Sequence, residues 1–146
     1  MKILTHNATA RMFEKVNSIR HMHSSWRCIQ LRLSALPQRN STQRTHFVLR
    51  GITELLEDDE GYVYLCHDHD IFILFQGRTH SILKKLTSYF ADLESDEMCS
   101  VYDLEKDWAF FFSICYRKSL RSGDDWASPA KNPPASRRLM EVQPTP

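Results

Sequence analysis

Glycine is scarce in this sequence, which has four glycines among 146 residues and no cluster of them. A loop that cradles phosphate groups needs clustered glycines, because only residues without a Cβ atom let the backbone approach a phosphate closely. We therefore expect no glycine-rich phosphate loop, which argues against the common nucleotide-hydrolysing and dinucleotide-binding classes.

Long apolar runs are also missing. None approaches the roughly 20 residues that a membrane-spanning helix requires. The first residues, MKILTHNATARMF, hold one lysine and two apolar residues before polar residues return, which is not the pattern of a signal peptide. The sequence therefore predicts a cytoplasmic protein with no membrane segment.

The four cysteines are far apart and form no C-x-x-C pair, so the usual zinc and redox motifs are absent. Cys66 and Cys115 lie inside apolar runs, where a free thiol behaves as a small core residue. This usage is typical of a reduced chain. Cys66 and His67 are not expected to form a catalytic dyad, because neighbours on a strand point to opposite faces.

Charge is balanced overall but unevenly distributed. The formal net charge is +1, which gives no general attraction to nucleic acid. Residues 15–53 contain seven Lys or Arg and no acid, whereas residues 54–70 contain seven acids and no Lys or Arg. This asymmetry is compatible with a docking face for a protein partner, with head-to-tail self-association, or with two solvated faces of one domain.

The length suits one domain, which we place at residues 1–118. Residues 119–146 hold five of the six prolines and little periodicity, so we expect a disordered tail there, with a short recognition segment over 137–142. Periodicity predicts helices over 8–21 (capped by Asn7), 45–56 and 79–93, a half-buried strand over 26–36, and further strands over 62–66, 71–75, 99–104 and 108–116.

The resulting order is α-β-α-β-β-α-β-β. Only four residues separate the strands 62–66 and 71–75, which forces an antiparallel hairpin. We therefore predict an α+β fold with a ferredoxin-like, nucleotidyl-cyclase-like antiparallel sheet and helices packed mainly on one face. Many unrelated functions use this plan, so the fold alone does not identify the function.

Three segments, in order, resemble the GGDEF (diguanylate cyclase) family. Its N-terminal motif, D-x-L-T-G-L-x-N-R-R-x-F, is matched by Leu4, Thr5, Arg11 and Phe13 at the right offsets. The segment FVLRGITELL is similar to the family's helix EVLREVAERL and comes directly before the hairpin. The signature turn, followed by an apolar strand, is matched by Asp68, His69, Asp70, Ile71 and Phe72, followed by ILF.

The departures from the family imply that cyclase chemistry is lost. Asp68 and His69 replace the two signature glycines, whose missing side chains let the backbone approach a GTP phosphate. Ile71 replaces the motif's glutamate, so that Asp70 is the one acid left. The first strand's metal-binding aspartate should fall within QLRLSAL (30–36), which has no acid, and phosphoryl transfer with two metals needs carboxylates from both places. The family's inhibitory R-x-x-D motif is missing as well.

The sequence therefore predicts a regulatory or protein-interaction domain in bacterial-type signalling, without catalysis and without a cofactor, that binds a protein partner and is compatible with a homo-oligomer. The alternatives are a metal sensor that uses His67 and His69, which project from one face of an extended segment, or nucleotide binding without turnover. Nucleic acid is a minor option, because DIFILFQG lacks the basic and small residues of an RNA-recognition strand.

Overall fold

A five-stranded sheet forms the centre of the computed structural model, which describes residues 1–33, 41–77, 79–90 and 98–127. Its strands are β1 (Lys2–Leu4), β2 (Trp26–Leu31), β3 (Tyr62–Leu65), β4 (Ile71–Gln76) and β5 (Cys99–Asp103). They lie in the order β1-β3-β4-β2-β5. β1 runs parallel to β3, and every other neighbouring pair is antiparallel, so the fold is a mixed α+β fold.

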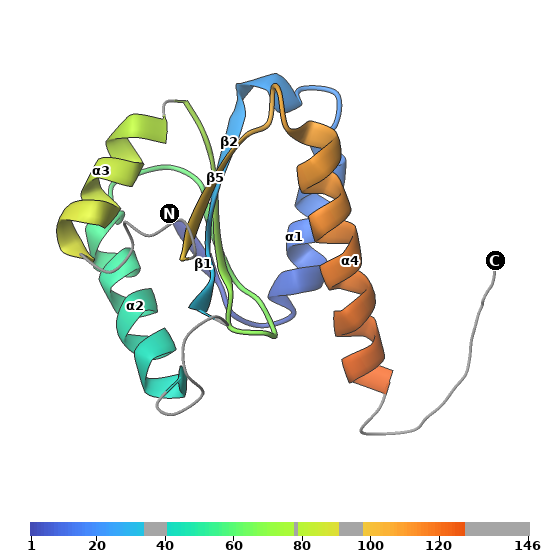
Figure 1. Ribbon diagram of the computed structural model, residues 1–146, viewed down its shortest axis with the longest axis horizontal. Coiled ribbons are helices and arrows are strands. Elements are labelled where there is room, and N and C mark those ends of the chain that lie inside the picture. Colours follow the sequence, from blue (N-terminus) through green and yellow to red (C-terminus); the bar gives the residue numbers. More distant parts are fainter. Residues whose placement is uncertain (34–40, 78, 91–97, 128–146) are drawn as a thin grey trace.

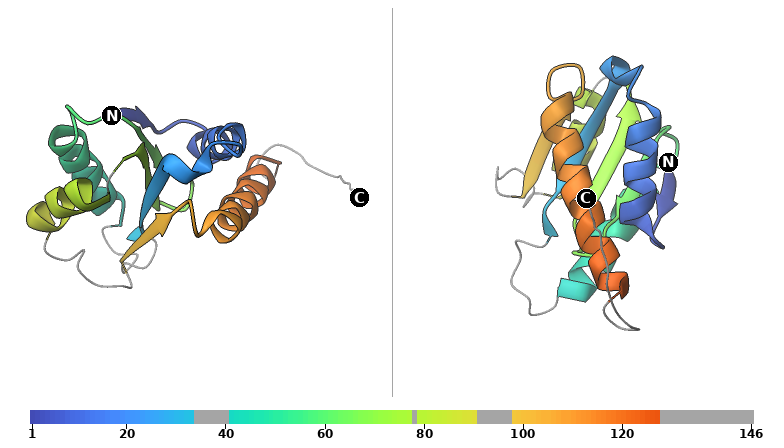
Figure 2. Two further views of the ribbon diagram at one scale, coloured as in Figure 1. Left: turned by 90° about the horizontal axis from the view of Figure 1, so that it is seen from above. Right: turned by 90° about the vertical axis from the view of Figure 1, so that its right-hand side faces the viewer.

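Two helices cover each face of this sheet, which gives three layers (Figure 1). α1 (Ala8–Ser18) and α4 (Trp108–Ala127) lie side by side on one face, whereas α2 (Ser41–Leu55) and α3 (Thr79–Tyr89) cover the other (Figure 2). A short 3-10 turn, η1 (His23–Ser25), leads into β2. The prediction that the helices pack mainly on one face is therefore wrong.

Each face of the sheet has its own hydrophobic core. Cys28 and Phe72 belong to the core under α1 and α4, and Ile29 and Ile73 belong to the core under α2 and α3. Neighbouring residues of a strand point to opposite faces, so the central strands β2 and β4 need apolar residues at successive positions. The prediction of a half-buried strand over 26–36 is wrong, because β2 ends at Leu31 and is buried on both faces.

The run WAFFFSICY (108–116), predicted as a strand, is the first half of α4. Phe111 and Cys115, four residues apart, are fully buried on the face toward the sheet, whereas Phe110 is 60% exposed. A short apolar run has no periodicity that distinguishes a strand from a buried helix, which is the physical reason for the error. With this run helical, β5 is an edge strand of the sheet.

The N-terminal segment also differs from the prediction. β1 was not expected, because three residues carry no measurable alternation, yet it pairs with β3. Asn7 precedes α1 in a left-handed conformation (φ 54°) and its side chain makes no capping hydrogen bond; only its carbonyl oxygen accepts the Arg11 N–H, at 3.0 Å. α1 ends at Ser18 rather than at residue 21.

The predicted domain boundary at residue 118 falls inside α4, which continues to Ala127. Residues 128–146, with the segment 137–142, lie outside the described residues, as does most of the connection that follows β2. Among the described helices, none combines the length and the apolar character that crossing a membrane would take.

Candidate functional site

The signature turn forms the tip of the β3–β4 hairpin. The Cys66 N–H donates to the Asp70 carbonyl oxygen at 2.9 Å, and the His69 N–H donates to the Cys66 carbonyl oxygen at 3.0 Å. Inside the turn, the Asp70 N–H donates to Asp68 Oδ1 at 3.1 Å. His69 has a φ of 74°, in the left-handed region that favours glycine. The backbone therefore has the glycine-type conformation at this position although a histidine occupies it.

Asp70, the residue that matches an acid of the GGDEF signature, is buried and hydrogen-bonded. Only 3% of this residue is exposed to solvent. Its Oδ2 accepts a hydrogen bond from Gln30 Nε2 at 3.2 Å and another from Lys118 Nζ at 3.3 Å. Gln30 belongs to β2, within the segment where the family carries its other acid. The Gln30 amide and the Lys118 ammonium group thus already bind Oδ2 of the carboxylate to which a metal ion would have to bind.

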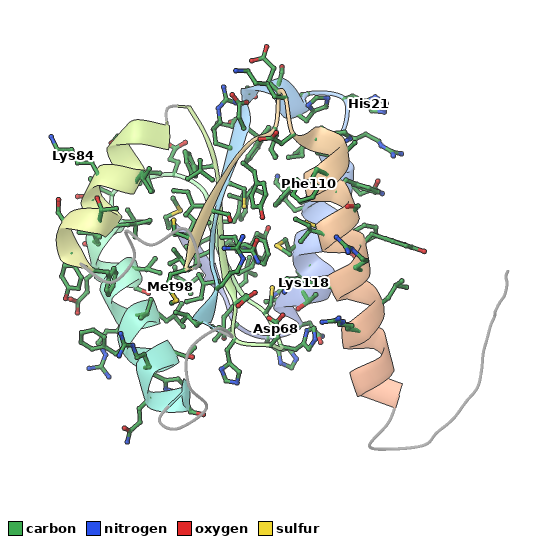
Figure 3. The ribbon with its side chains drawn as sticks, in the orientation of Figure 1. His21, Asp68, Lys84, Met98, Phe110 and Lys118 are labelled. Atoms are coloured by element: carbon green, nitrogen blue, oxygen red, sulfur yellow. The ribbon has the colours of Figure 1, made fainter. Side chains whose placement is uncertain are left out.

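Lys118 of α4 bridges the two acids of the turn. Its ammonium group donates to Asp68 Oδ2 as well as to Asp70, and lies 5.6 Å from the centre of the Phe72 ring (Figure 3). Burial raises the pKa of Asp68, but the hydrogen bond and charge of Lys118 outweigh it and hold that pKa below its usual value. Burial lowers the pKa of Lys118, and the two carboxylates outweigh it and raise that pKa. We call Asp68, Lys118 and Asp70 the lysine-bridged turn.

A second polar side chain extends this network across the sheet. The Tyr102 hydroxyl of β5 donates to Gln30 Oε1 at 2.7 Å, so that the Gln30 amide links Tyr102 to Asp70. Burial is the main cause of the raised pKa of Tyr102. Both polar ends of the buried amide are therefore satisfied, which a buried glutamine requires.

The predicted strand over 108–116 does not identify Lys118 as a partner of the turn. As a helix, the same residues place Phe111, Cys115 and Lys118 at positions i, i+4 and i+7, on one stripe. A lysine on an otherwise buried stripe indicates a carboxylate partner. The helical period of α4 was therefore the signal that could have revealed it.

The two histidines of the turn do not form a chelating pair with further ligands. His67 is exposed, and its Nδ1 lies 3.2 Å from Thr9 Oγ1. The His69 Nδ1 is buried with no hydrogen-bond partner among the residues that the structure describes. His23 is bound elsewhere, since its Nδ1 lies 2.7 Å from the Leu104 carbonyl oxygen, and the neighbouring His21 lies at the opposite end of the molecule from Asp68 (Figure 3).

No group of three or more His, Cys, Asp or Glu side chains could hold a metal ion within the described ranges. The three cysteines 28, 66 and 115 are buried free thiols. Burial raises the pKa of all three, that of Cys66 to about 12. They are protonated core residues, without the thiolate character of a nucleophile or a metal ligand.

One residue of the N-terminal segment that resembles the family motif contacts the turn. Thr9, where the family has asparagine, is 2% exposed and its Oγ1 accepts the His67 N–H at 3.3 Å. Leu4 is buried in β1, and Phe13 packs on Phe112 with ring centres 5.4 Å apart. Thr5 is exposed, and Arg11 lines a surface hollow away from the turn.

The two remaining residues of the signature, Ile71 and Phe72, are fully buried.

In comparisons with known proteins, the chain matches no family model, no curated protein and no solved structure. The geometry of the turn and of the surfaces around it therefore carries the functional inference.

Proposed function

We propose that this chain is a GGDEF-like domain that has lost cyclase chemistry and acts as a cytoplasmic regulatory or protein-interaction domain in bacterial-type signalling. The observation that carries the proposal is the state of Asp70, the one acid retained by the signature turn. It is 3% exposed, and Gln30 and Lys118 donate to the same oxygen atom. A divalent cation would have to displace the ammonium group of Lys118 before it met this carboxylate.

The cationic side chain supplies charge that a bound metal would otherwise supply. Mg²⁺ coordinates carboxylates together with waters and substrate phosphates, which requires open positions around the acid. At the lysine-bridged turn, one ammonium group pairs with two carboxylates, and it cannot coordinate a phosphate and a carboxylate in the manner of a metal. The turn is thereby suited to a structural role, in which it fixes α4 against the hairpin.

The order of the elements supports the finer fold assignment within this proposal. β2, α2, β3, β4, α3 and β5 follow one another with a strand order of β3-β4-β2-β5, and both helices lie on one face. This is the split βαβ plan that ferredoxin-like and nucleotidyl-cyclase-like domains share. β1, α1 and α4 are additions to that plan, and α4 delivers Lys118.

Exposed apolar side chains favour an interaction role over a merely structural one. Phe47 of α2 and Tyr89 of α3 are 61% and 51% exposed, and both contact Phe90, with ring centres 6.3 and 4.7 Å apart. Large aromatic residues in contact with water are characteristic of protein-binding surfaces when they gather with other apolar groups. We propose a protein as the partner, with no cofactor.

Turnover and ligand binding by the purified full chain test this proposal. We expect no conversion of GTP in the presence of Mg²⁺ or Mn²⁺, and no rise of the unfolding midpoint with GTP–Mg²⁺, cyclic di-GMP or Zn²⁺. A ligand at 100 times its Kd would stabilise the fold by about 2.7 kcal/mol, which such a measurement resolves. GTP turnover that Asp70→Ala abolishes would refute the proposal, and a midpoint raised by Zn²⁺ would favour the histidine-based alternative.

A further inference from the structure

The outer surface of the α2–α3 layer carries an apolar groove remote from the lysine-bridged turn. Leu55 of α2 and Ser81, Lys85 and Tyr89 of α3 line an open hollow of about 480 Å³ there. A shallow apolar hollow of this kind suits a side chain of a partner protein better than an enclosed small molecule. This layer faces away from α1 and α4 (Figure 1), so the groove is independent of the site described above.

Two exposed aromatic rings stand beside this groove. Phe47 of α2 and Tyr89 of α3 are 61% and 51% exposed, and both contact Phe90, with ring centres 6.3 and 4.7 Å apart. Gly51 allows this arrangement, because a Cβ atom there would lie 2.7 Å from Phe90 Cζ and 3.0 Å from Tyr89 Cε1. α2 and α3 therefore meet closely at Gly51 and hold the two rings outward.

Charges of opposite sign border the groove on its two sides. On the α3 side, Lys84 lines the groove and extends away from the sheet (Figure 3). On the α2 side, the exposed Glu54 lies three positions after Gly51 and seven after Phe47, on the stripe of α2 that contacts α3, and the exposed Asp58 follows in the turn after the helix. Lys85 is already paired with Asp59 at 2.7 Å. No ion pair engages Lys84, Glu54 or Asp58 within the part of the chain that the structure describes.

We propose that a second copy of this chain binds the groove in a two-fold symmetric dimer, an inference that rests on the proposed role as an interaction domain. In a two-fold interface the same patch faces itself, so the basic side of one groove meets the acidic side of the other, twice. Tyr89 and Phe47 of each copy then cover the apolar groove of the other.

The mixed charge of the groove is what selects a second copy as the occupant. An acidic peptide that met Lys84 would also meet Glu54 and Asp58, and a basic peptide would meet Lys84. Like charges placed opposite each other at an interface exclude the wrong partner. A copy of the same surface, turned by the two-fold axis, matches both signs at once.

Sedimentation velocity of the full chain, over a concentration range of about 1 to 100 µM, tests the proposal because weak dimers dissociate within it. We expect a monomer–dimer equilibrium in the unmodified chain. Lys84→Glu alone, or Glu54→Lys together with Asp58→Lys, should raise the dimer Kd at least about tenfold, since each creates like-charge contacts at both ends of the interface.

Mixing the two charge-reversed proteins gives the decisive readout. Each is repulsive with itself, but together they restore opposite charges at both contacts, so the equimolar mixture should dimerise again. Lys106→Glu, at an exposed lysine on the turn before α4, is the matched control and should leave the equilibrium unchanged. Tyr89→Ala removes the apolar contact and should also weaken the dimer, with the unfolding midpoint reported for every variant.

A monomer at all concentrations would overturn the dimer, and so would a dimer that Lys84→Glu leaves intact or a mixture that stays monomeric. These results are distinct from failure of the proposed function, which GTP turnover decides. A monomer without turnover refutes the dimer alone.

Discussion

Lys118 and Asp68 form an ion pair although they are 50 residues apart in the sequence, and the pair fastens α4 to the tip of the β3–β4 hairpin. Lys118 is 12% exposed and Asp68 is 25% exposed, so water screens the pair only in part. The same ammonium group reaches Asp70 at 3.3 Å. One side chain thus binds two acids that would otherwise repel each other.

Replacement of this lysine tests how much the bridge stabilises the fold. Lys118→Met keeps most of the apolar stem and removes the charge, which leaves Asp70 buried without its cation. Removal of one partner from a buried pair costs about 3 kcal/mol or more. We expect a loss of about that size in the free energy of unfolding, measured with urea. Lys106→Met, at an exposed lysine, is the control, and an equal loss in both variants would contradict the assignment.

The two shifted pKa values predict how stability depends on pH. The pKa of Asp68 is lowered in the fold, so its contribution is present above the ordinary value of 3.8 and is lost as pH falls through the lower folded value. The pKa of Lys118 is raised, so its contribution is present below the ordinary value of 10.5 and is lost as pH rises through the higher folded value.

We therefore expect the difference in unfolding free energy between the unmodified chain and Asp68→Asn to stay constant near neutral pH and to shrink in the strongly acidic range. Urea unfolding at a series of pH values measures it. A difference that shrank between neutral pH and pH about 5 would contradict a lowered carboxyl pKa.

The left-handed backbone at His69 predicts the rank of two substitutions. With φ at 74°, a residue with a Cβ atom is strained there, whereas glycine is not. His69→Gly should therefore be more stable than His69→Ala by about 1 kcal/mol, by thermal or urea unfolding. In a helix the order is reversed, so Ala109→Gly in α4 is an informative control. Equal stability of the two variants at position 69 would disprove strain at this turn.

The buried thiols predict the reactivity of the cysteines. Burial raises the pKa of Cys66 to about 12, so that its thiolate is almost absent at neutral pH. Cys28 and Cys115 are equally buried, and Cys99 is partly exposed. A thiol reagent such as DTNB should modify at most one cysteine in the native chain and all four in urea. Rapid modification of two or more native thiols would contradict the protonated core assignment.

Those parts of the molecule whose local pattern fits a single type of structure are predictable from the sequence alone. The hairpin follows from two apolar runs with four polar residues between them, and α1, α2 and α3 follow from apolar side chains at helical spacing. The scarcity of glycine and the residue types of the turn are also read directly from the sequence, because they do not depend on folding.

The environment of that turn, by contrast, depends on contacts between distant elements. The apolar run 108–116 carries no periodicity that separates a strand from a buried helix, so its helical form depends on packing against α1 and the sheet. The bridge depends on that form, since α4 delivers Lys118 to Asp68 and Asp70 only as a helix. Once the run is known to be helical, its buried lysine indicates a carboxylate partner, but which acid it pairs with leaves no local signal, because Lys118 and Asp68 meet only after distant elements have been brought together.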